Sequence, residues 1–341
     1  MYVIDEIKLE QFQKLLAISE IDWVTIVGTK TGILFAVDTN ETLAVLQYNS
    51  IRAGKDDDFA IRVQKSRIQP ILRTGRFEMI CTEDTVTIAV VERVSIQNDA
   101  GETEVRDAHR YSIKMPRHKA FVTTLAKRLK MLKKGDSFDA SQLDKVATIA
   151  KRFKTYVNCS DNYASIELRS GTCIVCKVSE MPEFALSYSA MDALFKCGTA
   201  WQCNGTNVYT IDANFGVLVT QCRSSDISVM NYFEASESGA SLIFTGDYTG
   251  LVHLLQKYKG CNLSINLDSK TAVISGNDIT VTTTMDISDC RRSEKCKSNE
   301  VNLNFEIVRD IVAKLTPNKV TVKVKKYFNQ IESGAFTILC K

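Results

Sequence analysis

The stretch VNLNFEIVRDIVAKLTPNKVTVKVKKYFNQIESGAFTILCK, residues 301–341, shows the unit from which the chain is built. Its opening VNLNF alternates apolar and polar residues like a strand, and the next segment repeats apolar residues at helical spacing. These apolar residues are Phe305, Val308, Ile311, Val312 and Leu315. TPNK predicts a turn, and VTVKVKKYF and GAFTILCK predict strands. The stretch is therefore one strand, one helix and further strands.

The same order of elements occurs five more times upstream, without runs of identical residues. The six opening strands are predicted to begin near Lys8, Phe59, Phe138, Phe184, Leu242 and Leu303. Pro70 falls within the second helix and should shorten or bend it. The longest gap between copies holds a polar hairpin at residues 95–113 and an extra basic helix at residues 118–135. The match between copies lies in element order and apolar period.

Pairs of these units predict an α+β protein of three domains. One strand–helix–strands unit cannot cover both faces of its own sheet, whereas two units together form a layered domain. Six units therefore give three domains, which we place at residues 1–116, 117–235 and 236–341. The extra basic helix belongs to the second domain.

The composition is that of an ordinary globular protein, with 45% hydrophobic and 24% charged residues. No apolar run is long enough to span a bilayer, so we expect no membrane partner. The N-terminus lacks the pattern of a secretion signal. We therefore interpret the 11 cysteines as reduced, mostly buried residues of a cytoplasmic protein, in a bacterium or an infected host cell.

Positive charge is concentrated in one part of the chain, although the net charge is only +3. Residues 114–154 contain twelve lysines and arginines against three acidic residues. Such a zone predicts a polyanionic partner that contacts one surface. An ordinary solvated helix face is an equally good interpretation of a single cluster.

No motif predicts catalysis, a cofactor or a metal site. The three histidines, His109, His118 and His253, lie in no nucleophile signature. Cys173 and Cys176 form a C-x-x-C within a predicted strand, where positions i and i+3 point to opposite faces. CRRSEKC, residues 290–296, is predicted to be a polar loop, VGTKTG at residues 27–32 a turn, and GKDDDF at residues 54–59 a solvated turn. A protein that works through its shape is therefore expected, and not an enzyme.

Six such units, paired into three domains with basic helices, resemble the bacterial β-type DNA polymerase sliding clamps. The resemblance covers nearly the whole chain and is closest at residues 205–233 and 301–341. It implies a head-to-tail homodimer closed into a ring, with helices inside and sheets outside, that encircles double-stranded DNA without reading sequence. Such a ring tethers the replicative polymerase for processive synthesis and has no catalytic residues or cofactor. The channel residues that the resemblance implies are Lys14, Lys65, Arg67, Arg73, Lys127, Arg128, Lys130, Lys145, Arg152, Lys196, Lys257, Arg309 and Lys314.

Members of this family bind short peptide motifs of the polymerase and the clamp loader in an apolar groove between the second and third domains. The family loop T-D-G-H-R-L corresponds here to residues 169–174, where only Gly171 is identical. The family's C-terminal strand corresponds to residues 336–341, with Cys340 in the place of a proline. The groove residues that the resemblance implies are Val157, Gly171, Thr172, Ile174, Phe336, Ile338 and Leu339. The departures from the family pattern suggest a bacteriophage or other mobile-element version.

Three alternatives stay open at this stage. The first alternative is a two-domain clamp that closes as a trimer, which would require that the first two copies of the repeat were assigned wrongly. A virion or assembly protein built of β-rich repeats would use the basic cluster for a protein or for packaged nucleic acid. An enzyme would need a site that leaves no trace in the sequence.

Overall fold

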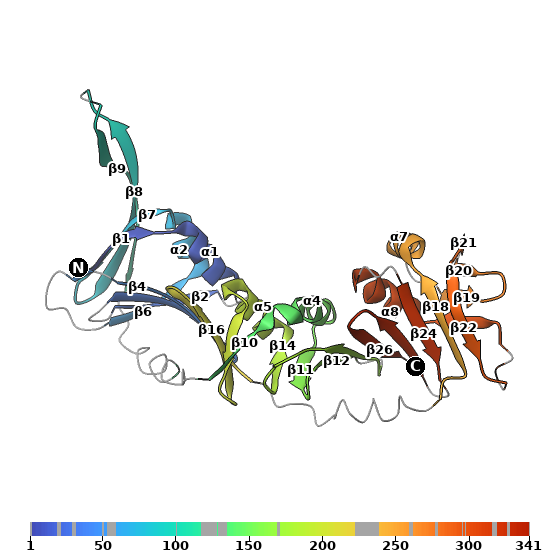
Figure 1. The fold of residues 1–341 in the computed structure, drawn as a ribbon. Coiled ribbons are helices and arrows are strands. Elements are labelled where there is room, and N and C mark those ends of the chain that lie inside the picture. The colour runs from blue at the N-terminus through green and yellow to red at the C-terminus, as the bar shows by residue number, and fades with distance from the viewer. Residues whose placement is uncertain are drawn as a thin grey trace. The chain divides into compact units, whose positions relative to one another are not determined.

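The computed structural model confirms the repeated unit of one strand, one helix and further strands (Figure 1). It describes residues 2–18, 22–28, 32–49, 51–52, 59–99, 101–116, 128, 135–168, 171–221, 239–258, 262–276, 279–294, 296, 298–315, 319–325 and 328–340. Most of the predicted basic helix at residues 118–135 lies outside these described residues, and so does the predicted boundary between residues 235 and 236.

The first two repeats contain the following elements. Repeat 1 is β1 (Tyr2–Ile7), α1 (Leu9–Ala17), β2 (Trp23–Gly28), β3 (Gly32–Asp38) and β4 (Thr42–Asn49), followed by the short β5 (Ile51–Arg52). Repeat 2 is β6 (Phe59–Gln64), α2 (Lys65–Ile68) with the 3-10 helix η1 (Gln69–Ile71), β7 (Gly75–Cys81), β8 (Thr85–Gln97) and β9 (Thr103–Pro116). The first strand ends before Lys8, so the predicted start near Lys8 was wrong. Pro70 lies in η1 directly after a four-residue α2, as expected of a residue without a backbone N–H.

The other four repeats follow the same plan. Repeat 3 is β10 (Asp136–Asp139), η2 (Ala140–Leu143), α4 (Asp144–Phe153), β11 (Tyr156–Ser160), β12 (Tyr163–Glu167) and β13 (Cys173–Lys177). Repeat 4 is β14 (Phe184–Ser187), α5 (Tyr188–Cys197), β15 (Ala200–Cys203), β16 (Asn207–Asp212) and β17 (Phe215–Thr220). Repeat 5 is β18 (Leu242–Asp247), α7 (Thr249–Lys257), β19 (Asn262–Asn266), β20 (Thr271–Ser275) and β21 (Thr280–Thr284), with an added β22 (Ile287–Arg292). Repeat 6 is β23 (Glu300–Leu303), α8 (Phe305–Asp310), η3 (Val312–Leu315), β24 (Lys319–Val324), β25 (Asn329–Ser333) and β26 (Phe336–Cys340).

Consecutive repeats exchange their first strands. The described strands form sheet A (β5-β1-β7-β8-β9), sheet B (β10-β15-β16-β17-β4-β3-β2-β6), sheet C (β14-β11-β12-β13-β26-β25-β24-β18-β22) and sheet D (β21-β20-β19-β23). β1 joins the later strands of repeat 2, and β6 joins those of repeat 1. Repeats 3 and 4 exchange β10 and β14, and repeats 5 and 6 exchange β18 and β23, in the same way. Each pair of repeats is thus interlocked by two strand pairings.

The long sheets B and C arise where the last strands of two repeats pair. In sheet B, β4 of repeat 1 pairs antiparallel with β17 of repeat 4. In sheet C, β13 of repeat 3 pairs antiparallel with β26 of repeat 6. The same element of the repeat therefore forms both junctions.

Local sequence explains where the helices begin and end. In α4, Val146, Ile149 and Ala150 are buried on one face. The helix stops at Lys154, whose backbone is left-handed with φ 50° and whose N–H bonds back to the last turn. Asn304 caps the N-terminus of α8, since its side chain accepts a hydrogen bond from the Ile307 N–H.

Aromatic residues fill the core between helices and sheets. The Phe35 ring makes edge-to-face contacts with Phe12 of α1 and Phe77 of sheet A, at centroid distances of 4.6 and 5.2 Å. The fully buried Trp201 packs against Phe138 and Phe195. No helix in the described residues is long and apolar enough to cross a membrane.

The chain divides into two compact units, one of residues 1–141 and 189–222 and the other of residues 142–188 and 223–341. Sheets A and B belong to the first unit, and sheets C and D belong to the second. The division separates repeat 4 from most of repeat 3. The three-domain boundaries stay a prediction.

Candidate nucleic-acid interface and partner groove

The most basic described helix face is that of α4. Its apolar side packs on β11 and β12 of sheet C. Lys145, Lys151 and Arg152 are exposed on the rest of the helix, where Asp144 is the one acidic residue. Lys151 was absent from the predicted channel set, although its position one residue before Arg152 places it on the same solvent side. This face presents several positive charges, but its side chains form no fixed arrangement that would recognise a nucleic-acid base or a small ligand.

Four predicted channel residues form ion pairs with acids on helices. The Nζ of Lys14 lies 3.5 Å from the carboxylate of Glu10, and that of Lys196 lies 2.8 Å from the carboxylate of Asp192. Arg309 and Arg152 both approach Asp310, with N–O distances of 2.8 and 3.6 Å. The hydrogen bond from Arg309 holds the pKa of Asp310 below its usual value. These acids reduce the net charge of the helix faces.

Lys65, Arg67 and Lys257 lie on or at the ends of the helices α2 and α7. Lys65 donates a hydrogen bond from Nζ to the Leu16 carbonyl at 2.7 Å, and burial lowers its pKa. Arg67 and Lys257 are exposed. Lys314 lies in η3.

Arg73 and Arg128 differ from the other predicted channel residues in their surroundings. Arg73 follows η1 and packs over the ring of Tyr111, 5.1 Å from its centroid. Arg128 pairs with the carboxylate of Asp38 and the carbonyl of Thr39, and its side chain is 13% exposed. Burial raises the pKa of Asp38, and the Arg128 charge opposes that shift. We leave both out of the proposed channel set, because Arg128 is largely buried and Arg73 lies beyond the end of η1.

Lys127 and Lys130 lie outside the described residues. Their assignment to the channel therefore stays a prediction from the sequence.

The two predicted walls of the partner groove are brought together in the second unit. β13 pairs with β26 so that Ile174 lies opposite Ile338 and Cys173 lies opposite Leu339. Gly171 occupies the turn before β13 with φ +76°, a conformation that glycine adopts without steric cost. The buried Thr172 closes this turn by accepting a hydrogen bond at its carbonyl from the Leu168 N–H. Segments that are distant in the chain thus pair in sheet C.

The predicted groove residues do not share one face of sheet C. Ile174 and Ile338 are 1% and 0% exposed and belong to a row of buried side chains across the sheet. The members of this row, in strand order, are Leu186, Val157, Ile166, Ile174, Ile338, Ile331, Val322 and Phe244. Phe336 lies two residues from Ile338 and faces the same side. These side chains form the core.

The opposite, outer face of the junction carries a separate apolar cluster. Leu339 packs there with Cys173 and Val175, and the half-buried Tyr163 and Phe328 complete the cluster. We call these five residues the outer cluster. Only Leu339 of the predicted apolar side chains belongs to it. The missed members follow from strand alternation once the register of β13 and β26 is known.

The buried cysteines are structural. The nine described cysteines are free thiols, of which Cys159, Cys173, Cys176, Cys197, Cys203 and Cys340 are buried. Burial raises the pKa of Cys173 to about 12 and that of Cys176 to about 11, so both stay protonated at neutral pH. In the described residues, no cluster of His, Cys, Asp and Glu side chains is arranged to hold a metal ion. Cys290 lies in strand β22, so the prediction of a loop there was wrong.

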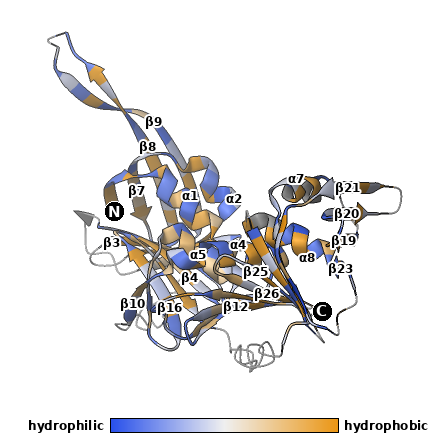
Figure 2. Ribbon diagram, turned by 45° about the vertical axis from the view of Figure 1, so that its right-hand side comes forward, coloured by the Kyte–Doolittle hydropathy of each residue, from blue (hydrophilic) through white to orange (hydrophobic). Residues whose placement is uncertain are grey.

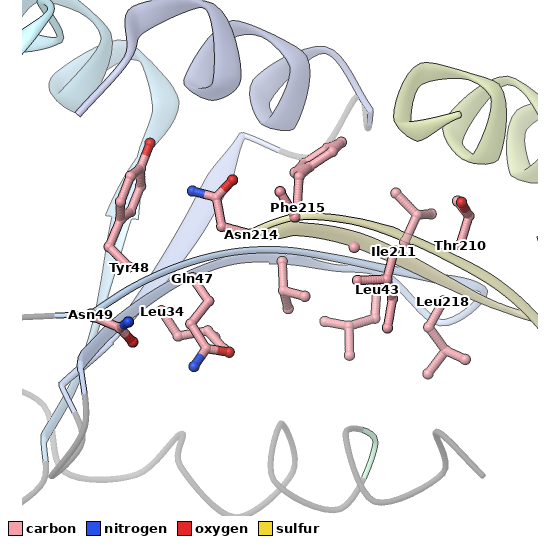
Figure 3. A pocket seen from close by; sticks show the side chains of 14 residues that line it. Leu34, Leu43, Gln47, Tyr48, Asn49, Thr210, Ile211, Asn214, Phe215 and Leu218 are labelled. Carbon is pink, nitrogen blue, oxygen red and sulfur yellow. The ribbon is translucent and has the colours of Figure 1, made fainter. Parts of the chain in front are cut away.

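The first unit contains a cavity of about 690 Å³ at the β4·β17 junction. In Figure 3, Tyr48, Asn214 and Phe215 point toward the helices, whereas Leu34, Gln47 and Leu218 point to the other side of the sheet. An apolar cluster that includes Leu34, Leu43 and Leu218 covers the outer face. The β4·β17 junction of sheet B corresponds to the β13·β26 junction of sheet C. The cavity therefore lies at the equivalent junction of the first unit. No sequence motif indicated it.

Comparison with solved structures shows which fold this is. The β subunit of the Streptococcus pyogenes DNA polymerase superposes with a TM-score of 0.67 at 9% identity, covering 100% of this chain and 99% of that one. The DNA polymerase III β subunit of Thermotoga maritima gives 0.65 at 8% identity, with 100% and 98% covered. The DNA polymerase sliding clamp of Pseudomonas aeruginosa gives 0.65 at 10% identity, with 100% and 99% covered. No protein-family model and no curated protein sequence matches the chain. The chain has the fold of these clamps over its full length, which confirms the fold prediction.

Proposed function

We propose that this chain is a DNA sliding clamp, a ring-shaped homodimer that encircles duplex DNA and tethers a replicative polymerase. The observation that carries the proposal is the way its repeats join. Repeats 1 and 4 join through their last strands, and so do repeats 3 and 6. The last strands of repeats 2 and 5, β9 and β21, each form a sheet edge in the described structure. If β9 of one copy pairs with β21 of a second, two copies close a ring with the junction that the chain already uses twice.

The backbone of β21 is ready for such pairing. The Gly276 N–H donates to the Ile279 carbonyl, and the Met285 N–H donates to the Lys270 carbonyl. Since hydrogen-bonded pairs alternate along an antiparallel ladder, the Thr283 N–H points toward β20 and the Thr282 N–H points away from it. The outward groups of β21 thus offer the pattern that a further antiparallel strand requires.

The helix faces support binding to duplex DNA without sequence selection. Exposed lysines and arginines such as Lys145, Lys151 and Arg67 neutralise phosphates, and phosphate contacts carry no sequence information. A helix surface with dispersed cations and nearby acids holds DNA weakly at each point. A ring of such faces is retained on DNA by its closed shape and stays free to slide.

We propose that partner peptides of the polymerase and the clamp loader dock on the β13·β26 junction. Of the outer cluster, the half-buried Tyr163 and Phe328 offer apolar surface above the buried Cys173, Val175 and Leu339, and the Gly171 turn precedes β13 of the same junction. An apolar peptide side chain gains about 25 cal/mol for each Å² that it buries on such a surface. The proposed protein has no catalytic activity and no cofactor, and it works in the cytoplasm of a bacterium or an infected host cell.

The test is retention on DNA of different topology. Protein diluted below its dimer dissociation constant is reconcentrated in the presence of nicked circular plasmid and then passed through a gel-filtration column in 0.5 M NaCl. A clamp stays with the circular DNA and is lost after a restriction enzyme linearises it. Equal retention on circular and linear DNA, or none on either, contradicts the proposal.

A further inference from the structure

The outer face of sheet B carries an apolar cluster that is buried, although α1 and α5 lie along the opposite face in both Figure 1 and Figure 2. The cluster crosses six neighbouring strands, from β16 to β6, and each buried member is at most 8% exposed. The buried members are Val27, Leu34, Ala36, Leu43, Ala60, Tyr209 and Leu218, and the partly buried Val45 packs against them. We call these eight residues the sheet B cluster. Their burial means that another part of the chain covers this face.

Arg128 identifies the part of the chain that covers this face. Its guanidinium donates hydrogen bonds to the carboxylate of Asp38 and to the carbonyl of Thr39, and its side chain is only 13% exposed. Asp38 lies on the outer face, because strand alternation puts it on the same side of β3 as Ala36 of the sheet B cluster. Asp38 also pairs with Leu43 of the cluster in the β3·β4 ladder. Arg128 is therefore bound at the border of the sheet B cluster.

The chain on either side of Arg128 is long enough to cover the cluster. Arg128 is bound at the end of β3, whereas Gly135 directly precedes β10 at an edge of sheet B, and β4, β17 and β16 lie between these two points. Because Arg128 binds on the outer face, residues 129–134 are expected to cross these strands on that face. Elsewhere in the first unit, the runs of residues that the structure does not describe contain at most six residues each, whereas residues 117–127 form a longer run. Residues 117–134 are thus the segment best able to cover the sheet B cluster.

The sequence of this segment has an apolar side and a basic side at helical spacing. The apolar side consists of Phe121, Leu125, Leu129 and Leu132. Arg128 belongs to this side, since it follows Leu125 by three residues and Phe121 by seven, and its own backbone is helical. The contact of Arg128 with Asp38 therefore turns the apolar side toward the sheet B cluster. The opposite side carries Lys127, Lys130 and Lys134.

We propose that residues 118–134 are an internal ligand of sheet B, which docks as an amphipathic helix on the sheet B cluster and occupies the outer face of the β4·β17 junction. Leu43 and Leu218 of the cluster also line the cavity at this junction, so the face has room for side chains of another segment. The lysines of the segment then point away from the sheet. Lys127 and Lys130 consequently lie on the side of sheet B opposite to α1 and α5, and not in the channel that the resemblance assigns to them.

The docking has a consequence for partner binding that rests on the proposed function. Each chain has two equivalent junctions, β4·β17 and β13·β26, that could each offer an outer face to a partner peptide. The segment covers the first junction with the chain's own apolar side chains. The β13·β26 junction is then the one that each chain leaves to the polymerase and the clamp loader.

Release of the segment tests the docking in the full-length protein. L125D/L129D puts two carboxylates against the sheet B cluster, and trypsin cleavage after Lys133 should become about 10-fold faster or more, because a docked helix must open before a protease cuts it. T123D/A126D is the matched control, since it adds the same charge on the opposite side of the helix, and its rate should stay within about 2-fold of the original protein. Mass spectrometry identifies the cut, and thermal melting checks that each variant is folded. Equal rates for the two variants overturn the docking, and so does an original protein that is cut as fast as a synthetic peptide of residues 116–136.

An exchange of charges tests the contact that orients the segment. R128D should speed cleavage after Lys133 about 5-fold, and D38R/R128D should return the rate to within about 3-fold of the original protein, because the exchanged residues attract each other again. An unchanged rate in R128D, or a double variant that is cut faster than R128D, contradicts the proposed orientation.

Binding to duplex DNA separates the docking from the ring. K127A/K130A should leave the slope of log affinity against log salt unchanged in fluorescence anisotropy, whereas a slope lower by about 2 would place both lysines against DNA and overturn the orientation. If the original protein is not retained on circular DNA, the proposed ring fails, and the cleavage rates still decide the docking. If it is retained and L125D/L129D is cut no faster than T123D/A126D, only the docking fails.

Discussion

The closed sheet junctions and the open sheet edges use the same strand of the repeat but different side chains. At the closed junctions, Ile174 faces Ile338 and Leu43 faces Leu218, all at most 3% exposed. At the open edges, β21 reads Thr-Val-Thr-Thr-Thr, and most of β9 is polar and exposed. The backbone of this strand can therefore form a closed junction or remain a sheet edge. The side chains are apolar where strands pair within the chain and polar at the two edges that, in the proposed ring, a second copy would cover.

The largest expected effect comes from breaking a closed junction. Ile338→Asp places a carboxylate in the buried row across sheet C and should lower the free energy of unfolding by about 4 kcal/mol or more. Thr337→Asn, on the opposite face of the same strand, should cost less than about 1 kcal/mol. Urea denaturation followed by circular dichroism measures both. Equal losses would mean that the junction is not part of the core.

The next largest effect comes from blocking an open edge. Thr282→Pro removes an outward N–H of β21 and should raise the dimer dissociation constant about 100-fold with little change in the stability of the monomer. Thr283→Pro removes an N–H that points to β20 and should instead destabilise the fold by about 3 kcal/mol. Sedimentation equilibrium and urea denaturation separate the two. A Thr282→Pro variant that dimerises normally would place the interface elsewhere.

The two faces of sheet C should differ in their effect on DNA. Lys145→Ala with Lys151→Ala on α4 should reduce the slope of log affinity against log salt by about 2, since each lost phosphate contact contributes about 0.9. The matched control is Lys177→Ala with Lys319→Ala, because both lysines are exposed on the outer face. Fluorescence anisotropy with duplex DNA at several salt concentrations measures the slopes. Identical slopes for the two variants would exclude α4 from the DNA interface.

The smallest effect concerns Asp310, which lies between two helix arginines. Asp310→Asn should tighten DNA binding about 2-fold to 3-fold, because Arg152 and Arg309 lose a nearby negative charge. The pKa of Asp310 is lowered in the fold, so its ion pairs stabilise the protein above the ordinary Asp pKa. That contribution is lost as the pH falls through the lowered value. The variant should therefore show a flatter loss of stability in acid, and an unchanged profile would mean that the pairs contribute nothing.

The sequence predicted the repeat and its helices, because amphipathic spacing and turn residues are local signals. Pro70 and the α4 face around Val146 are examples. The sequence did not predict the exchange of first strands, since pairing between β1 and β7 depends on contacts distant in the chain. For the same reason the sequence did not predict which faces of sheet C the candidate groove residues occupy. Strand alternation separates Leu339 from Ile338, but which face is the core depends on the register with β13.

Charge in the sequence was less informative about the candidate DNA interface than apolar spacing was about the fold. Lysines and arginines on helices are visible in the sequence, but their neutralising partners are not. Arg128 illustrates this, because its partner Asp38 lies ninety residues away and buries the guanidinium. Arg73 was assigned to the channel by the family resemblance, whereas in the structure it lies beyond η1, which ends at Ile71.

The most direct test of the ring is the solution mass of the protein. Sedimentation equilibrium at micromolar concentration should give twice the chain mass of 38.1 kDa, because two copies with three pairs of repeats each leave no edge of β9 or β21 open. A trimer, or a monomer at every concentration tested, would contradict closure through these two strands. A large polymer would point to the same edges joining without closing, as in an assembly protein.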